Sequence, residues 1–249
     1  MSYSQLLKFS PGKGNAKLQS LGGVVYTFSL PSGWSCPSAK DCLSKAVLEN
    51  GKYHIEDGKH TQFRCFSATQ EVVYTAVREQ RQFNYNLLLQ HKNSAIDMAA
   101  LISESLPDKA TVIRIHVGGD FFNEEYMAAW IMVALLNPEK TFYAYTKSLN
   151  YWVSLQQEIP SNFKLNASKG GRHDNLITQH NLKYAEVVYT EQEAKDKNLE
   201  IDHDDSHAFL KDDSFALLIH GVQPRGSLAS EAVVNLKGVG SYGKPRKTN

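Results

Sequence analysis

The alternation of strands and helices in the second half of the chain constrains the fold more than any other feature. Five short stretches rich in β-branched and aromatic residues are typical of strands: 111–117, 141–147, 163–169, 185–190 and 215–221. Helical spacing follows each of them, in the segments 123–136, 150–159, 174–180, 191–198 and 227–236. With a sixth strand at 24–30, the pattern predicts an α/β fold with parallel strands and right-handed crossovers.

Polar side chains on one face of these strands bear on the architecture. Because side chains alternate along a strand, Arg114 and His116 share one face of their strand, and Tyr145 and Lys147 share one face of the next. Asn166 adds a polar side chain to the third strand. A parallel sheet covered by helices on both sides is apolar on both faces. The pattern therefore favours a partial (β/α)6 barrel, TIM-like, over an open doubly wound sheet. Polar strand ends near solvent are the alternative explanation.

Length and composition indicate one soluble domain. The chain has 249 residues and a formal net charge of +1, with no signal peptide and no apolar stretch of transmembrane length. We therefore expect a single cytoplasmic domain over 1–249, with no membrane partner and with no overall charge that favours nucleic acid. Its appendages are an N-terminal arm at 1–23, a hairpin excursion at 49–65 and a frayed basic tail at 240–249.

The carboxyl ends of the predicted strands carry a concentration of reactive side chains, and parallel β/α proteins place their sites there. Candidates for polar contacts or proton transfer at this edge are His116, Asp120, Tyr145, Lys147, Lys169 and His220. Two glycine pairs, Gly118-Gly119 and Gly170-Gly171, would let the backbone approach a ligand closely. A tight turn explains each pair on its own, and only their shared edge favours a binding site.

Three cysteines, Cys36, Cys42 and Cys65, are all that the chain contains. An odd number in a reducing compartment argues against disulfides. If the hairpin folds back, Cys65 meets the other two beside the first strand. Three thiolates suit a [4Fe-4S] cluster with one open iron, or a Cys3His zinc site completed by His54 or His60. Three unrelated buried cysteines are the third explanation.

Four segments together give the sequence a family resemblance: LPSGWSCPSAKDCLS (30–44), FRCFSATQE (63–71), IRIHVGGDFFN (113–123) and FYAYTKSLNYW (142–152). Over about residues 20 to 225 the chain resembles an uncharacterised phage and prophage protein family. This implies the host cytoplasm as its location. More distantly it resembles radical S-adenosylmethionine enzymes, which have a (β/α)6 partial barrel and a three-cysteine loop for a four-iron cluster. That resemblance implies S-adenosylmethionine as a cofactor, contacted by the turn at Gly118-Gly119.

Two classes of function follow from these features. The first is an iron–sulfur enzyme that acts on a small molecule at the barrel mouth by redox, sulfur-transfer or radical chemistry, served by an electron or sulfur donor protein. The second is a carrier or binding module without turnover, held by a cluster or by zinc. A further segment, IDHDDSHAF (201–209), could bind a metal but is more simply an acidic surface loop.

Overall fold

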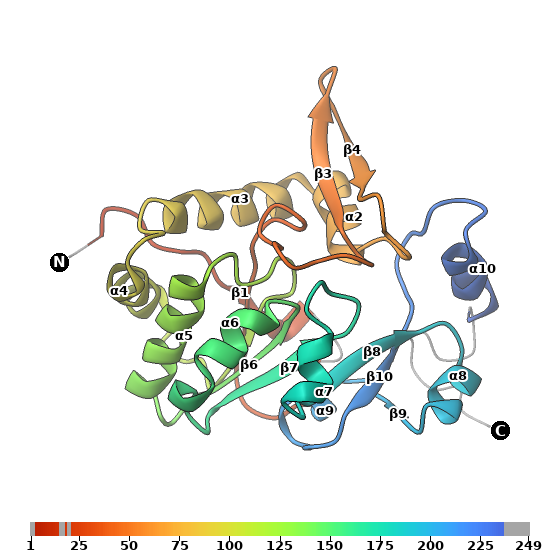
Figure 1. Ribbon diagram of the computed structural model, residues 1–249. Helices are drawn as coiled ribbons and strands as arrows, with labels where there is room; N and C mark the ends of the chain where they lie inside the picture. Colours follow the sequence, from red (N-terminus) through yellow and green to blue (C-terminus); the bar gives the residue numbers. More distant parts are fainter. Residues whose placement is uncertain (1–2, 15–17, 19–20, 237–249) are drawn as a thin grey trace.

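The computed structural model describes residues 3–14, 18 and 21–236, and its central element is an eight-stranded sheet (Figure 1). One strand, β1 (Ser10–Pro11), pairs antiparallel with its neighbour at one edge. The others run parallel: β2 (Val25–Phe28), β5 (Val112–Ile115), β6 (Thr141–Thr146), β7 (Phe163–Ser168), β8 (Tyr184–Val188), β10 (Phe215–Leu218) and β9 (Glu200–Ile201). The predicted α/β fold with a mostly parallel sheet is confirmed.

The strands lie in the order β1-β2-β5-β6-β7-β8-β10-β9. From β2 to β10 this order follows the chain, whereas a doubly wound sheet reverses its order partway across. Right-handed crossovers between strands in chain order place the connections on one face of the sheet. Among the described residues, β1 and β9 each pair with one neighbour only, so the sheet has two edges and closure into a barrel is not shown.

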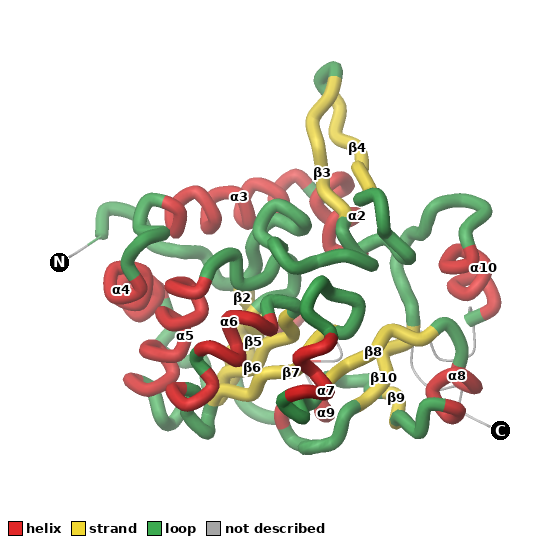
Figure 2. Tube along the Cα trace, in the orientation of Figure 1, coloured by secondary structure: helices red, strands yellow, loops and turns green. Residues whose placement is uncertain are grey.

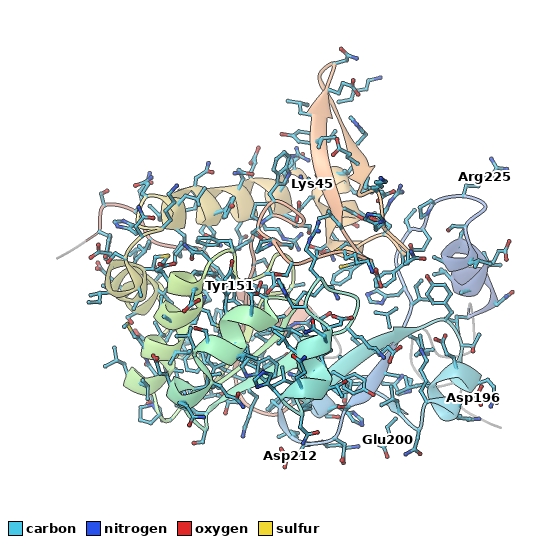
Figure 3. The ribbon with its side chains drawn as sticks, in the orientation of Figure 1. Lys45, Tyr151, Asp196, Glu200, Asp212 and Arg225 are labelled. Carbon is cyan, nitrogen blue, oxygen red and sulfur yellow. The ribbon has the colours of Figure 1, made fainter. Side chains whose placement is uncertain are left out.

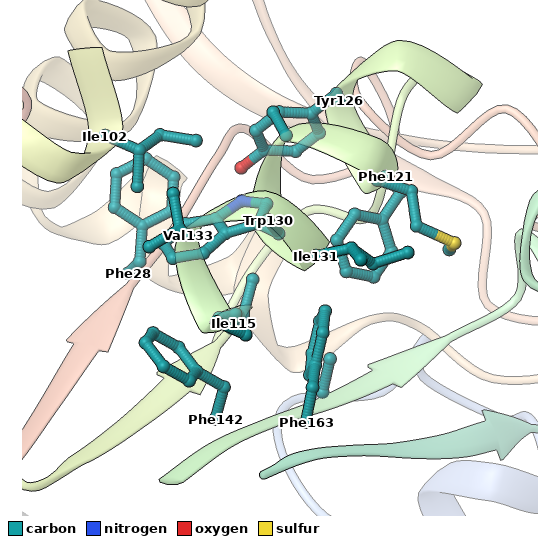
Figure 4. Packing of buried hydrophobic residues seen from close by; sticks show 14 of the residues in the cluster. Phe28, Ile102, Ile115, Phe121, Tyr126, Trp130, Ile131, Val133, Phe142 and Phe163 are labelled. Carbon is teal, nitrogen blue, oxygen red and sulfur yellow. The ribbon is translucent and has the colours of Figure 1, made fainter. Parts of the chain in front are cut away.

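One face of the sheet, which we call the helix face, is covered at its centre by helix α5 (Glu124–Leu136). Helix α5 is apolar almost all round, which is typical of a buried helix. Its Trp130 is fully buried, with its ring centroid 5.5 Å from Phe28 and 6.3 Å from Phe142 (Figure 4). The helices are α2 (Phe66–Val73), α3 (Thr75–Leu89), α4 (Ala95–Ser105), α5 (Glu124–Leu136), α6 (Leu149–Ser154), α7 (Asn175–Gln179), α8 (Glu191–Asp196), α9 (Ser206–Phe209) and α10 (Leu228–Asn235), with 3-10 turns η1 (Gly12–Gly14) and η2 (Gln156–Glu158).

The opposite face of the sheet is polar at its centre and is covered by the segment around α9. Arg114 of β5 forms a buried ion pair with Asp205, and the hydroxyl of Tyr143 donates to the same carboxylate at 3.0 Å. The amide of Asn166 donates to the carbonyl of Ala208 at 2.8 Å. The expectation that 201–209 is an acidic surface loop is therefore wrong, because its central carboxylates are buried against this face.

His116 lies on the helix face, and the prediction that it shares a face with Arg114 is wrong. Strand β5 ends at Ile115, and the regular alternation of side chains ends with it. The imidazole is buried with its Nε2 atom 3.0 Å from the hydroxyl of Tyr126. Burial lowers the pKa of His116 to about 3, so the ring is neutral at physiological pH.

The predicted excursion is a two-stranded hairpin that projects from the molecule (Figure 1). Its strands are β3 (Ser44–Glu49) and β4 (Lys52–Asp57), so the hairpin begins earlier than the predicted 49–65. Asn50 and Gly51 form the turn with positive φ angles of 50° and 75°, as a two-residue hairpin requires. The basic tail at 240–249 lies outside the described residues. Within them, no helix has the length and apolarity needed to cross a bilayer.

Candidate functional site

The loop that follows β2, residues 31–43, carries Cys36 and Cys42 across the carboxyl edge of the sheet. Figure 2 shows loop segments gathered between this edge and the hairpin. The turn after β5 anchors the start of the loop, because the amide of Leu30 donates to the carbonyl of Gly118 at 2.8 Å. The turn after β7 anchors its middle through an isolated bridge between Ala39 and Gly171. The backbone thus holds both cysteines at the predicted edge.

The chain returns from the hairpin to this loop and brings Cys65 with it. The amides of Gln62 and Phe63 both donate to the carbonyl of Asp41, at 2.7 and 3.1 Å. The amide of Cys65 then donates to the hydroxyl of Ser44 at 3.3 Å. Asp41 and Ser44 flank Cys42 in the sequence, so these contacts place Cys65 beside it. The predicted return of the hairpin is confirmed.

The three cysteines are partly buried and free of disulfides, and Cys42 is close enough to Cys36 and to Cys65 to influence the pKa of both. Burial raises the pKa of the Cys36 thiol well above its usual range, and Asp120 and the thiols of Cys65 and Cys42 add to the rise. Burial, reinforced by Cys42, raises the pKa of Cys65 to about 11. Each thiol is therefore protonated at neutral pH unless a cation takes the place of the proton.

Backbone amides favour negative charge on two of these sulfur atoms, and one of them makes a hydrogen bond to its sulfur. Cys65 is the N-cap residue of α2, and the amides of Ser67 and Ala68 in the first turn lower its pKa against the larger effect of burial. The amide of Gly33 donates to the Sγ atom of Cys36 at 3.3 Å. Amide donors of this kind stabilise a sulfur that carries negative charge.

A buried ion pair ties the two cysteine segments together. The guanidinium of Arg81 on α3 contacts the carboxylate of Glu71 on α2 at 2.7 Å, and both side chains are almost fully buried. The same carboxylate accepts from the amide and the hydroxyl of Ser32, each at 2.9 Å. Ser32 lies four residues before Cys36, and Glu71 lies on the helix capped by Cys65. Sequence reasoning missed this pair, because its members lie on different helices and share no local spacing.

Asp120 and Lys147 adjoin the cysteines at the same edge. The Asp120 carboxylate accepts from the hydroxyl of Thr146 at 2.6 Å and from the amide of Lys147 at 2.8 Å. Burial raises the pKa of Asp120 to about 6, and these donors oppose the rise. Burial also raises the pKa of Cys42, while the nearby ammonium of Lys147 lowers it. Asp120 and Lys147 are thus two of the predicted polar residues that lie with the thiols.

Comparison with known proteins gives the chain a family. A family model described as GP88, Gene product 88, matches residues 5–236. The chain belongs to the Gene product 88 family. Relatives named Gene 88 protein, from Mycobacterium phage L5 and Mycobacterium phage D29, are each 30% identical over 163 residues, 61% of this chain. The match spans 58% of each relative's length. No solved structure matches the chain.

Membership of the Gene product 88 family confirms the resemblance to a phage family. The comparisons give no support to the more distant resemblance to radical S-adenosylmethionine enzymes. The turn expected to contact that cofactor is closely packed by the protein itself. A Cβ atom on Gly118 would lie 2.0 Å from the Ser67 hydroxyl, and one on Gly119 would lie 2.6 Å from Leu30 and from Ser35. Close packing therefore explains why glycine occupies both positions, without a bound cofactor.

The other predicted polar residues of this Gene product 88 chain lie apart from the thiols, with one exception. Tyr145 lies on the face covered by α9, with the Arg114 guanidinium 5.4 Å from its ring centroid. Lys169 forms an exposed salt bridge with Glu186 at 2.8 Å. His116 is in the helix-face core, as described above. The exception is His220, whose ring lies 4.9 Å from that of Phe66, the residue after Cys65.

The histidines proposed for a zinc site do not complete one. His54 lies on β4 with its Nε2 atom 3.6 Å from the carboxylate of Glu49, near the turn of the hairpin. His60 is exposed in the turn that follows β4. Among the residues that the structure describes, no three His, Cys, Asp or Glu side chains form a group that could hold a single metal ion. Neither the cysteines nor the acidic segment 201–209 therefore forms such a group. In that segment His207 contacts Asp202, and it also contacts Glu200 just before the segment.

Proposed function

We propose that Cys36, Cys42 and Cys65 hold one [4Fe-4S] cluster whose fourth iron has no cysteine ligand. The observation that supports the proposal is that backbone contacts bring the segments of all three cysteines to one edge of the sheet. There Cys65 and Cys42 add to the raised pKa of Cys36, and Cys42 adds to that of Cys65. Thiolate is the ligand that such clusters require. A cubane is wider than a single ion, so it suits thiols that interact without forming a single-ion site.

The surroundings of the thiols support a cluster over zinc. The Gly33 amide donates to the Sγ atom of Cys36, and the amides of the first turn of α2 lower the pKa of Cys65. Amides near cluster sulfurs tune iron–sulfur potentials. A Cys3His zinc site needs a fourth ligand in tetrahedral contact, and His54 is paired with Glu49 out on the hairpin. Zinc also needs its ligands within one tight group, and the described residues contain none.

We further propose that the sheet acts as the wall of a partial barrel with its reactive mouth at the cysteines. When bound, the cluster would supply an open iron for Lewis-acid, electron-transfer or sulfur-accepting chemistry on a small molecule. Lys147 would place a cation beside Cys42, and Asp120 would offer a buried carboxyl group whose pKa is about 6. We do not extend the proposal to S-adenosylmethionine, because Gly118 and Gly119 are closely packed by the protein's own side chains.

Metal and sulfide analysis of the full chain after anaerobic loading tests the proposal. About four irons and four acid-labile sulfides per chain are expected, with a broad visible absorption band. Each of the changes Cys36→Ala, Cys42→Ala and Cys65→Ala removes one of three ligands, so each should bleach the protein. His54→Ala is the matched control and should retain the colour.

One zinc per chain without labile sulfide would contradict the proposal, and metal loss on His54→Ala or His60→Ala would show the zinc site instead. Retention of iron and colour by all three cysteine variants would show that the thiols are not ligands. Circular dichroism of each apo variant distinguishes loss of a ligand from loss of the fold.

A further inference from the structure

A second candidate site lies beside the hairpin and does not depend on the cysteines. A pocket of about 310 Å³ lies between the cysteine loop, the hairpin and helices α2 and α3. Trp34 and Tyr53 give it two aromatic rings, and Arg78, Glu79 and Gln82 give it charged and polar groups. A pocket with both kinds of wall suits a flat ligand that has polar edges.

Trp34 is much more exposed than the other tryptophans of the protein. Its residue is 50% exposed, whereas the other two tryptophans, Trp130 and Trp152, are 0% and 8% exposed. Its indole N–H donates to the carbonyl of Ala46 at 3.2 Å, which fixes the ring beside β3. A large aromatic ring that is held in place and half exposed is typical of a contact residue for a ligand.

Each aromatic ring of the pocket already has a cation of the protein against it. The ammonium of Lys45, labelled in Figure 3, lies 4.5 Å from the centroid of the Trp34 ring. The guanidinium of Arg78 lies 3.7 Å from that of Tyr53 and donates to the carbonyl of Glu71 at 2.6 Å. Two carboxylates also line the pocket, Glu71 and Glu79, and that of Glu71 is paired with Arg81 at 2.7 Å. Lys45 and Arg78 therefore attract an anionic group at the aromatic end of the pocket, away from a ligand edge that meets Glu79.

We propose that this pocket binds a nucleobase that carries a phosphate, as a free nucleotide or within a single strand. Trp34 and Tyr53 supply faces on which a base stacks. The side chains of Gln82 and Glu79 supply a donor and acceptors for the edge of the base, and Lys45 and Arg78 supply charge for the phosphate. The chain's net charge of +1 provides no long-range attraction, so affinity depends on contacts inside the pocket.

Tryptophan fluorescence of the full chain tests the proposal directly, because Trp34 is half exposed and the other two tryptophans are buried. Adenosine monophosphate and a ten-nucleotide oligodeoxyadenylate should both quench the emission. The duplex of the same oligonucleotide should not, since its bases are already stacked. Anisotropy of a fluorescein-labelled oligonucleotide then gives affinities for the variants. Two phosphate contacts at most predict a weak salt dependence, with a slope of about −1.4 in log K against log salt.

Trp34→Ala should weaken binding roughly tenfold, and Trp34→Phe should retain most of the affinity. Arg78→Ala should weaken binding and flatten the salt dependence. Tyr74→Ala is the matched control, because Tyr74 is 58% exposed at the junction of α2 and α3 but does not line the pocket. If the oligodeoxyadenylate binds much more tightly than adenosine monophosphate, the ligand of the pocket is single-stranded nucleic acid. Similar affinities for the two probes indicate that the ligand is a free nucleotide.

Three results would overturn the proposal. They are no quenching by either probe at millimolar concentration, unchanged affinity in a folded Trp34→Ala variant, and equal binding of the duplex. Iron content is measured on the same preparations, so a failure here is distinguishable from a failure of the cluster proposal.

Discussion

Replacing Arg81 with methionine should destabilise the protein more than any surface substitution. The Arg81 side chain is 6% exposed, and its guanidinium donates hydrogen bonds to Ser67, Gln70 and Glu71. Methionine fills much of the same volume but provides no charge and no donor. The carboxylate of Glu71, whose side chain is 2% exposed, would then keep the two donors of Ser32 as its hydrogen-bond partners among the described residues.

The magnitude follows from the burial of the carboxylate. Removing one partner of a buried ion pair leaves an uncompensated charge and costs about 3–5 kcal/mol. A typical domain has about 5–15 kcal/mol of stability in total, so Arg81→Met would remove a large part of it. The loop that carries Cys36 and the helix that begins after Cys65 meet at this pair, and we expect the variant to bind less iron as well.

Urea unfolding of the metal-free protein measures the effect as a change in the free energy of unfolding. The double variant Glu71→Gln, Arg81→Met removes both charges, retains an acceptor for Ser32 and should recover at least half of the loss. Arg78→Met, one turn earlier on α3, is the matched control and should cost only about 1 kcal/mol. A loss below about 1 kcal/mol for Arg81→Met, or a double variant no more stable than the single one, would refute the reasoning.

Two further predictions concern His116 and Gly118. Burial lowers the pKa of His116 to about 3 from 6.5, so the unfolded chain binds a proton here at pH values where the native state does not. The contribution of neutral His116 to the free energy of unfolding is therefore present above pH 6.5 and is lost as the pH falls. The loss reaches about 3 kcal/mol at pH 4.5. Urea titrations at several pH values should show this loss in the wild type and not in His116→Phe. The same dependence of the free energy of unfolding on pH in both proteins would contradict the prediction. Gly118→Ala should lower the free energy of unfolding by about 1–3 kcal/mol, because the added Cβ would lie 2.0 Å from the Ser67 hydroxyl. In the control Gly51→Ala the added Cβ meets no atom within 4 Å, so only the positive φ of this residue should lower the free energy, by about 1 kcal/mol. Thermal melts that rank the two variants in the opposite order would contradict the packing argument.

The parallel sheet could be predicted from the sequence because its signal is local. Each strand is a short apolar run followed by helical spacing, and right-handed crossovers then restrict the topology. The turn at Asn50 and Gly51 likewise has local chemistry, and it locates the hairpin even though the predicted start was late. The position of Cys36 and Cys42 follows from the rule that sites lie at the carboxyl ends of strands.

The pairings between distant residues could not be predicted in the same way. Arg114 and Asp205 are 91 residues apart, and nothing in the spacing of either segment indicates the other. One signal does exist in the sequence, because an arginine in the middle of an apolar strand needs a buried anion. The acidic segment 201–209 is a source of such an anion, and this requirement argues against an exposed loop there.

The covering of the polar face explains why the candidate site is confined to the edge of the sheet. Tyr145 and Lys147 are two residues apart on one strand and its end, yet their environments differ. Tyr145 lies beside Arg114, on the face where α9 packs. Lys147 lies beyond the end of β6, and its ammonium donates to the carbonyls of Ser168 and Lys169, both at 2.7 Å, at the end of β7. The polar pattern that predicted a reactive barrel interior thus has two separate causes: a structural ion-pair network under α9, and a charged edge that adjoins the three thiols.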